Sequence, residues 1–274
     1  MSQPTVIAHR GYAGVAPENT VAAAEFAAAR EETEMLEIDV QPAACGTPVV
    51  FHDDRLDGDR DGRPITDGEG LVWETDLETL ADCEVLESGA SVPTLERFLA
   101  ALPDSIGVNV ELKNPGTADR RPGEALPAAD RAERRERWSP FVERVVEVCE
   151  GFGGEILFSS FCEGAIAAAR DVAAGYPAAA LCYTDLEAGL QVARRYDCEA
   201  IHPPRNAIAG TALAGEAYDA LPAADPAVDL LETAREAGWA VNVWTVDTWV
   251  QFDQLRRAGV DGIVVEYPGL GGEP

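Results

Sequence analysis

Two short apolar runs of the sequence carry polar side chains at every second position. These side chains are Glu37 and Asp39 in the run 36–40 and Asn109, Glu111 and Lys113 in the run 106–113. Residues two positions apart in a β-strand point to the same face, and carboxylates that share a buried face need positive charge nearby. One interpretation is a divalent cation bound by Glu37, Asp39 and Glu111, since Mg²⁺ and Ca²⁺ prefer oxygen ligands. The other is a set of ion pairs between these carboxylates and the cations Arg10 and Lys113.

Histidine and lysine are both scarce in this chain. Of the three histidines, His9 ends an apolar run, His52 follows Val-Val-Phe and His202 precedes two prolines. Imidazole exchanges protons near pH 7 and is the usual acid/base group of enzymes, although a histidine at a strand end can also be structural. Lys113 is the single lysine beside 20 arginines. Its place next to a carboxylate indicates either a site that requires a compact ammonium group or an ordinary strand residue.

Eight short apolar runs alternate with helical patterns along the chain. The runs cover 6–9, 36–40, 106–112, 155–158, 178–182, 199–202, 240–244 and 262–265. The helical patterns cover 22–30, 93–102, 139–150, 163–173, 186–196, 226–237 and 250–258, with Asn19 or Thr20 as the first N-cap. This alternation predicts an α/β fold, a single TIM (β/α)8 barrel over residues 1–274 with catalytic groups at the carboxyl ends of the strands. The polar, Gly/Asp-rich stretch of about 54–91 is predicted to be a small insertion after the second strand.

The charge balance excludes several kinds of partner. Lys and Arg total 21 and Asp and Glu total 49, which gives a net charge of −28. A chain this acidic lacks the basic face that nucleic acids or an anionic membrane would require. The beginning of the chain lacks the features of a signal peptide, and no window is apolar enough for a transmembrane helix, so we expect a cytoplasmic protein without stable membrane insertion. Abundant carboxylates with almost no lysine are typical of adaptation to high salt, so we expect a halophilic prokaryotic source.

Taken in order, nine short motifs of the sequence resemble those of the glycerophosphodiester phosphodiesterase family, over about residues 5 to 268. The motifs are His9-Arg10-Gly11, Pro17-Glu18-Asn19-Thr20, Glu37-Ile38-Asp39-Val40, Pro48-Val49-Val50-Phe51-His52-Asp53, Pro93-Thr94-Leu95, Val110-Glu111-Leu112-Lys113, Ser159-Ser160-Phe161, Val243-Trp244-Thr245-Val246 and Gly259-Val260-Asp261-Gly262-Ile263. Each motif alone is weak evidence for the family, but the motifs together, in the same order and spacing, are specific for it.

The resemblance implies a TIM barrel that hydrolyses a small glycerophosphodiester to glycerol phosphate and an alcohol, a step of glycerol and lipid metabolism. It implies one divalent cation, Mg²⁺ or Ca²⁺. It also suggests that the substrate's own glycerol hydroxyl attacks first and releases the alcohol, giving a cyclic phosphate that water then opens to glycerol phosphate. The implied roles are cation binding by Glu37, Asp39 and Glu111, acid/base catalysis by His9 and His52, phosphate contact by Arg10 and Lys113, a place near the phosphate for Asn19, and contact with the glycerol or the leaving group for Trp244.

Two features leave alternatives open. Glu266 stands where the family pattern has an aspartate before Tyr-Pro, which affects the fine shape of the barrel mouth. The Arg-rich stretch 114–137 predicts either a surface that recruits anionic head groups or a solvated helix stabilised by Glu/Arg pairs. Two further functions compete with the first: a phospholipase-type enzyme that acts on intact lipids, and a noncatalytic barrel that binds phosphodiesters.

Overall fold

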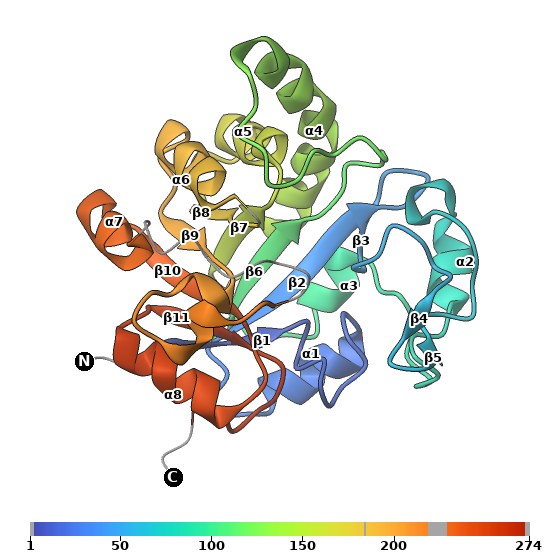
Figure 1. Ribbon diagram of the computed structural model, residues 1–274. Helices are drawn as coiled ribbons and strands as arrows, with labels where there is room; N and C mark the ends of the chain where they lie inside the picture. Colours follow the sequence, from blue (N-terminus) through green and yellow to red (C-terminus); the bar gives the residue numbers. More distant parts are fainter. Residues whose placement is uncertain (1–2, 184, 219–228, 272–274) are drawn as a thin grey trace.

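Eight parallel strands close into a barrel in the computed structural model, which describes residues 3–183, 185–218 and 229–271 (Figure 1). The barrel strands are β1 (Thr5–His9), β2 (Met35–Pro42), β6 (Gly107–Leu112), β7 (Ile156–Ser160), β8 (Ala178–Leu181), β9 (Ala200–His202), β10 (Ala240–Val246) and β11 (Gly262–Val265). Pairing of β1 with both β2 and β11 completes the ring. The predicted TIM barrel is therefore confirmed, and each predicted run overlaps its strand.

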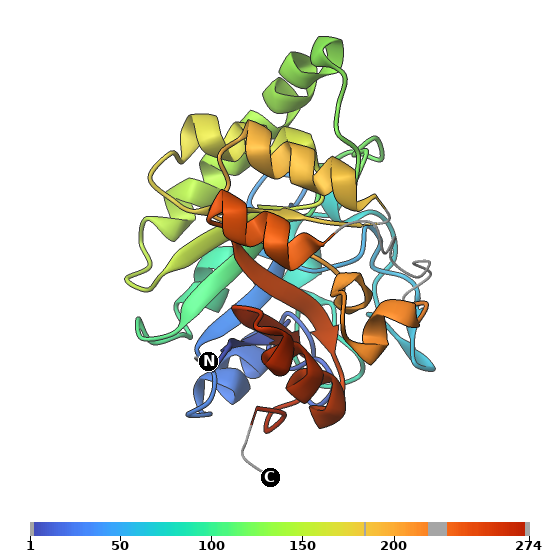
Figure 2. The same cartoon turned by 60° about the vertical axis from the view of Figure 1, so that its left-hand side comes forward.

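The helices cover the outside of the barrel and bury its outer apolar surface. They are α1 (Val21–Ala28), α3 (Leu95–Leu99), α4 (Ala128–Cys149), α5 (Glu163–Val172), α6 (Leu186–Arg195), α7 (Leu230–Ala237) and α8 (Trp249–Ala258). Figure 2 shows α7 and α8, in orange and red, lying against β10. Short 3₁₀ turns, η2 (Arg205–Ala207) and η3 (Ala212–Gly215), follow β9. None of the described helices is long and apolar enough to cross a lipid bilayer.

Local sequence signals set the ends of these helices. The Thr20 side chain accepts a hydrogen bond from the backbone N–H of Ala23, so Thr20 rather than Asn19 is the N-cap of α1. Gly238 and Gly259 end α7 and α8 in the left-handed conformation, with φ of 75° and 85°. The Arg-rich stretch continues into a single 22-residue helix, α4. The predicted helix 226–237 is confirmed as α7 from residue 230, and residues 226–228 lie outside the described residues.

The segment between β2 and α3 packs beside the barrel and builds a small core of its own. β3 (Pro48–Val50) pairs antiparallel with β2, and after it come β4 (Asp59–Arg60), β5 (Arg63–Pro64), η1 (Val72–Glu74) and α2 (Leu77–Asp82). Leu56, Val72 and Leu80 are fully buried there against Val49 and Phe51. The segment lies to one side of the barrel in Figure 1, and its β4–β5 hairpin contributes residues to the mouth of the barrel.

Candidate active site

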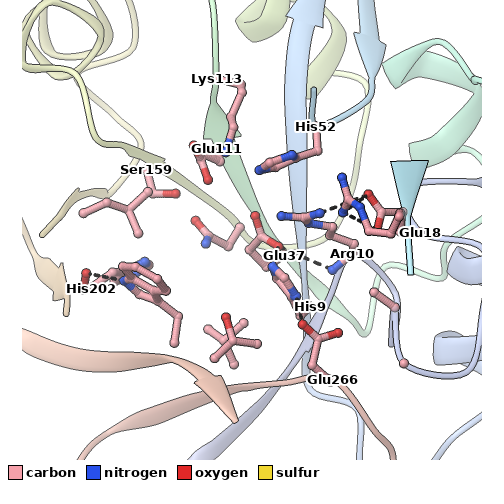
Figure 3. Close-up of a pocket in the computed structure, with 18 of the residues that line it drawn as sticks. His9, Arg10, Glu18, Glu37, His52, Glu111, Lys113, Ser159, His202 and Glu266 are labelled. Atoms are coloured by element: carbon pink, nitrogen blue, oxygen red, sulfur yellow. Dashed lines mark hydrogen bonds and ion pairs between the residues drawn. The ribbon is translucent and has the colours of Figure 1, made fainter. Parts of the chain in front are cut away.

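A cavity of about 1060 Å³ opens at the carboxyl ends of the barrel strands. Residues of all eight barrel strands or of the loops that follow them meet in it, and Figure 3 shows ten of these side chains with labels. The residues that line it include His9, Arg10, Glu37, His52, Glu111, Lys113, Trp244 and Glu266. Seven of the nine predicted site residues therefore border one space. This is the end of the fold where TIM barrels carry catalytic groups.

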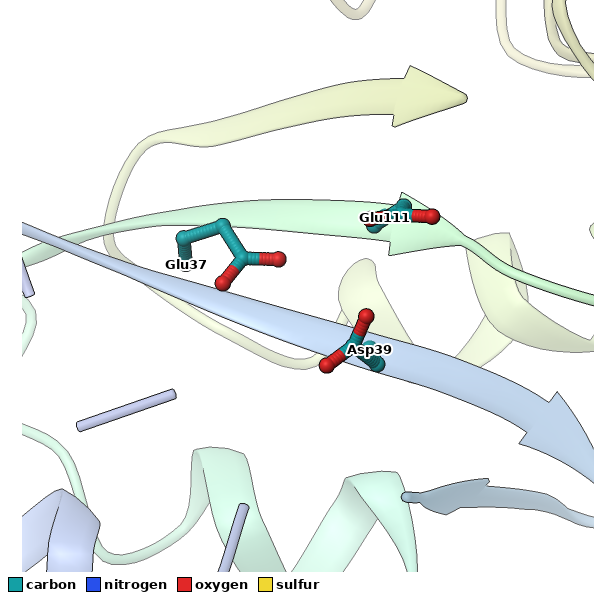
Figure 4. Close-up of side chains that lie close together, drawn as sticks. All are labelled: Glu37, Asp39 and Glu111. Carbon is teal, nitrogen blue, oxygen red and sulfur yellow. The ribbon is translucent and has the colours of Figure 1, made fainter. Parts of the chain in front are cut away.

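Three buried carboxylates form the floor of this site (Figure 4). Asp39 of β2 pairs in register with Glu111 of β6, and Glu37 lies two residues earlier on the same face of β2. One carboxylate oxygen from each residue lies within 4.8 Å of the others. A buried group of oxygen donors at this spacing matches the ligands that Mg²⁺ or Ca²⁺ takes.

Two basic residues partly neutralise these carboxylates. Lys113 Nζ lies 3.2 Å from Asp39 Oδ1 and 3.1 Å from Glu111 Oε1, and Arg10 Nε lies 3.1 Å from Asp39 Oδ2. Burial opposes ionisation of Asp39, but Lys113 and Arg10 hold its pKa well below the usual range. Burial and the charge of Asp39 raise the pKa of Glu37 to about 8, and burial also raises that of Glu111. Burial therefore still disfavours the ionised forms of Glu37 and Glu111 beside the two basic residues, and an additional cation between them would favour these forms.

His9 and His52 approach the site from β1 and from the loop after β3. His9 Nδ1 lies 2.6 Å from Glu266 Oε1, while His52 Nδ1 lies 3.2 Å from Asp53 Oδ1. Burial lowers the pKa of His9, but the charge and hydrogen bond of Glu266, together with the charge of Glu37, raise it overall. Burial and the charge of Arg10 lower the pKa of His52 to about 4. The protein thus holds two imidazoles in one cavity with opposite proton affinities, an arrangement suited to acid and base roles.

Asn19 and His202 are held by neighbouring residues. The Asn19 side chain is buried, and its Nδ2 donates to Asp39 Oδ2 at 2.9 Å, while its Oδ1 accepts from the Asp39 backbone N–H at 3.3 Å. Asn19 therefore fixes Asp39 rather than bordering the cavity. His202 Nε2 lies 3.0 Å from Asn242 Nδ2, and burial lowers the pKa of His202 to about 3, so this ring is neutral at pH 7.

Trp244 belongs to an aromatic wall on the far side of the cavity. Its ring centroid lies 5.6 Å from Phe161 and 5.9 Å from Tyr218, and Phe161 lies 5.7 Å from Tyr183. The Trp244 indole N–H donates to the backbone carbonyl of His202 at 2.9 Å, which fixes the ring. Four aromatic rings meet here, Trp244 from β10 and the other three from loops, and only Trp244 among them is in the predicted site.

Sequence reasoning missed the polar groups that surround the predicted ones. Glu18 accepts a hydrogen bond from Arg10, Asp53 contacts His52, and Arg60 of β4 joins both carboxylates. Glu18 and Asp53 lie in the motifs already quoted, directly next to the predicted site residues Asn19 and His52. This adjacency is the sequence signal that indicates a place for them at the site. Arg60 lies in a stretch without such a signal.

The side chains of Asn109 and Ser159 lie deep in the barrel and border the same cavity. Both polar atoms of the Asn109 amide and the Ser159 hydroxyl have no hydrogen-bond partner among the described residues. A buried polar atom left unpaired costs about 1–3 kcal/mol, so these three atoms are suited to receive polar groups of a molecule that enters the cavity. The alternation that predicts the strand around Glu111 also points Asn109 inward.

The contacts of the Arg-rich stretch 114–137 favour the predicted solvated helix over a surface that recruits anionic head groups. Its arginines pair with carboxylates: Arg120 with Asp54, Arg121 with Glu124 and Asp130, Arg131 with Glu163, Arg134 with Asp119, Arg135 with Asp171, and Arg137 with Asp119 and Glu133. Of these six arginines, Arg120 alone borders the cavity. The other five stabilise α4 and the loop before it.

A closed (β/α)8 barrel with acidic, basic and imidazole groups gathered at the carboxyl ends of its strands defines a TIM-barrel enzyme. The model of the glycerophosphoryl diester phosphodiesterase family matches residues 9–270. The chain therefore belongs to this family of phosphodiesterases, as its motifs predict.

Relatives and solved structures agree along nearly the full chain. A glycerophosphodiester phosphodiesterase of Caldanaerobacter subterraneus subsp. tengcongensis is 28% identical over 274 residues, covering 96% of this chain and 94% of the relative. A glycerophosphodiester phosphodiesterase of Bacillus subtilis is 25% identical over 281 residues, covering 96% and 84%. The structure of an Oleispira antarctica phosphodiesterase in complex with the product sn-glycerol-3-phosphate superposes with a TM-score of 0.73 at 25% identity, covering 97% of this chain and 94% of that one.

Proposed function

We propose that this protein hydrolyses glycerophosphodiesters to glycerol phosphate and an alcohol, with one divalent cation and two histidines. The observation that carries the proposal is the meeting of three kinds of group in one cavity: the carboxylate cluster, the cations Arg10 and Lys113, and the imidazoles of His9 and His52. A phosphodiester is anionic and gains charge on its nonbridging oxygens as it reacts, so cations preorganised around it lower the barrier. The product found with the Oleispira antarctica enzyme is consistent with a glycerol phosphate product here.

Glu37, Asp39 and Glu111 are the residues that would hold the cation, either Mg²⁺ or Ca²⁺. When bound, the cation would offset negative charge on the phosphate oxygens. Asn19 would keep the Asp39 carboxylate oriented through its two hydrogen bonds. An Asn19 in this role acts through Asp39 and not on the phosphate itself.

Arg10 and Lys113 would bind the phosphate beside this cluster. Both side chains are mostly buried, yet both border the cavity. Arg10 brings a planar group that can donate to two oxygens at once, whereas Lys113 brings a compact charge between Asp39 and Glu111. Lys113 can therefore contact the carboxylates and an incoming phosphate oxygen from one place.

His9 and His52 would exchange protons with the attacking and the leaving oxygen. Each ring has its Nδ1 next to a carboxylate, Glu266 for His9 and Asp53 for His52, so Nε2 would be the atom that acts on the substrate. His9 Nε2 lies 3.7 Å from Glu37 Oε2, beside the proposed cation ligands. A carboxylate on Nδ1 orients the ring and stabilises its protonated form. Glu266, despite its additional methylene relative to aspartate, reaches His9 at 2.6 Å.

Asn109 and Ser159 would receive glycerol hydroxyl groups at the floor of the cavity, since their polar atoms lack partners among the described residues. The aromatic wall around Trp244 offers an apolar face to the carbon atoms of the glycerol or of the leaving alcohol. A cavity with a polar floor and an apolar wall suits a small substrate that is polar on one side and less polar on the other.

Action on intact lipids is a second candidate function. Three large apolar side chains that border the cavity are solvent-exposed, Val15 at 52%, Tyr183 at 37% and Tyr267 at 39%. Such side chains can contact an acyl chain at the mouth. Turnover of a diacyl phospholipid at a rate equal to that of the deacylated diester would favour this candidate.

The test separates catalysis from binding alone. We expect His9→Ala and His52→Ala to lose turnover of glycerophosphocholine by about a hundredfold or more, while glycerol phosphate still binds in calorimetry. His202→Gln is the matched control because its ring is neutral and held by Asn242, and we expect less than a tenfold loss. Wild-type turnover in both His9→Ala and His52→Ala would refute the acid/base roles, and binding without turnover in the wild type would favour a noncatalytic barrel.

A further inference from the structure

Arg60 reaches into the site from outside the barrel. It ends β4, in the hairpin of the segment between β2 and α3, and its side chain is 27% exposed. Its Nη1 donates to Glu18 Oε1 and Oε2 at 2.9 and 2.7 Å, and its Nη2 donates to Asp53 Oδ2 at 2.5 Å. One guanidinium therefore joins two carboxylates that are 35 positions apart in the chain.

Each of these carboxylates also holds a group of the proposed catalytic site. Glu18 Oε1 accepts from Arg10 Nη1 at 3.0 Å, and Asp53 Oδ1 lies 3.2 Å from His52 Nδ1. Asp53 thus contacts His52 with one oxygen and Arg60 with the other. Figure 3 shows Arg10 and His52 next to each other at the cavity, with Glu18 beside Arg10.

The geometry requires the fork of an arginine. Nη1 serves Glu18 and Nη2 serves Asp53, whereas a lysine has a single nitrogen. The charge matters as well, because without Arg60 the Glu18 carboxylate would keep Arg10 as its cationic partner, whereas Asp53 would keep only its contact with the His52 ring. Charge-assisted hydrogen bonds to partly buried carboxylates are among the stronger ones in proteins.

We propose that Arg60 is a positioning residue that orients Arg10 through Glu18 and His52 through Asp53, and so makes the β4–β5 hairpin part of the catalytic apparatus. The kinetic consequences of this inference rest on the proposed function. The orientation of Arg10 and His52 rests only on the hydrogen bonds of Arg60, Glu18 and Asp53. Arg60 does not need to touch the substrate in this role.

Removal of Arg60 has a definite electrostatic consequence at His52. The charged groups that face this ring are Asp53, Asp39, Arg10 and Lys113. In the wild type, Asp53 shares its charge between Arg60 and His52. Without Arg60 the whole charge of Asp53 acts on His52 and favours its protonated form. We therefore expect the proton affinity of His52 to rise when Arg60 is neutralised.

Nuclear magnetic resonance of the histidine rings tests this directly, since the chain has only three and His52→Gln identifies the relevant signal. The protein is loaded with Mg²⁺ or Ca²⁺ and titrated as wild type, Arg60→Gln and Arg55→Gln. Arg55 lies in the same segment, pairs with Asp57 and does not border the cavity, so it is the matched control. We expect the His52 pKa to rise by about 0.5 or more in Arg60→Gln alone. Identical His52 titration in the wild type and Arg60→Gln would overturn the proposal.

Kinetics give the second readout. We expect kcat/KM for a glycerophosphodiester to fall about 10- to 100-fold in Arg60→Gln, by less in Arg60→Lys, and not at all in Arg55→Gln. Wild-type kcat/KM in Arg60→Gln would overturn the proposal. Because ring titration needs no turnover, a wild type that hydrolyses no glycerophosphodiester would refute the proposed function while the His52 result still decides the role of Arg60.

A second pair of variants covers the case in which Arg60→Gln does not fold. Arg60→Lys is made in the wild type and in Asp53→Asn, and the His52 titration is compared between the two backgrounds. We expect Arg60→Lys to raise the His52 pKa only where Asp53 is present, because the effect passes through that carboxylate. Equal shifts in both backgrounds would contradict this path.

Discussion

The buried His202 ring makes folding sensitive to mild acid. This side chain is 1% exposed, and burial lowers its pKa from an ordinary value of 6.5 to about 3. Between these two values the unfolded chain binds a proton at His202 and the folded protein does not. Stability therefore falls as the pH is lowered from 6.5 toward 3.

The size of the effect follows from the two pKa values. At pH 5.0 the unfolded ring is almost fully protonated and the folded ring almost fully neutral, so the loss is about 1.5 pH units at 1.36 kcal/mol each, or about 2 kcal/mol. His202→Gln keeps a polar group near Asn242 but cannot titrate. The wild type should therefore lose about 2 kcal/mol more than His202→Gln between pH 7.5 and 5.0.

Denaturant unfolding at constant KCl measures this difference. The free energy of unfolding is obtained for both proteins at pH 7.5 and 5.0, so that contributions from all other titrating groups cancel. An equal pH dependence in the wild type and His202→Gln would show that His202 takes up a proton in the folded state and would refute the reasoning.

Three further predictions follow from the site and the charge of the chain. Glu266→Gln removes the charge that favours protonated His9, so we expect the pKa of His9, measured by ring titration, to fall. We also expect kcat to fall about tenfold or more, and an unchanged His9 titration would contradict this prediction. Asn19→Ala frees Asp39, and we expect cation affinity measured by calorimetry to fall about tenfold, whereas unchanged affinity would remove Asn19 from the site. Molar KCl screens the charge of −28, so we propose that the thermal unfolding temperature rises steeply with KCl, and a flat response would refute adaptation to high salt.

The sequence predicts the fold well because the barrel depends on short-range signals. Apolar runs alternate with helical patterns, and capping residues such as Thr20 and Gly259 act within one turn. The same reasoning predicts that Glu37 and Asp39 share a face, since side chains two positions apart in a strand point to the same side of the sheet. Pairing of Asp39 with Glu111 required the register between β2 and β6, which the closed barrel supplies.

The rest of the site depends on contacts between segments that are distant in the chain. Arg60 meets Glu18 across 42 positions, and Glu266 meets His9 across 257. No local pattern marks Arg60, because the path of the segment after β3 sets its position. Asn19 shows the opposite case: its motif marks it, but only the structure reveals that its partner is Asp39.

We propose cation-dependent hydrolysis of a glycerophosphodiester as the activity of this protein. The most direct test is release of glycerol phosphate from glycerophosphocholine and glycerophosphoglycerol in molar KCl, with Mg²⁺, with Ca²⁺ and with EDTA. We predict release that requires one of the two cations, stops with EDTA and is lost in Glu37→Gln. No release with either cation from a folded protein, or undiminished release in EDTA, would contradict this activity.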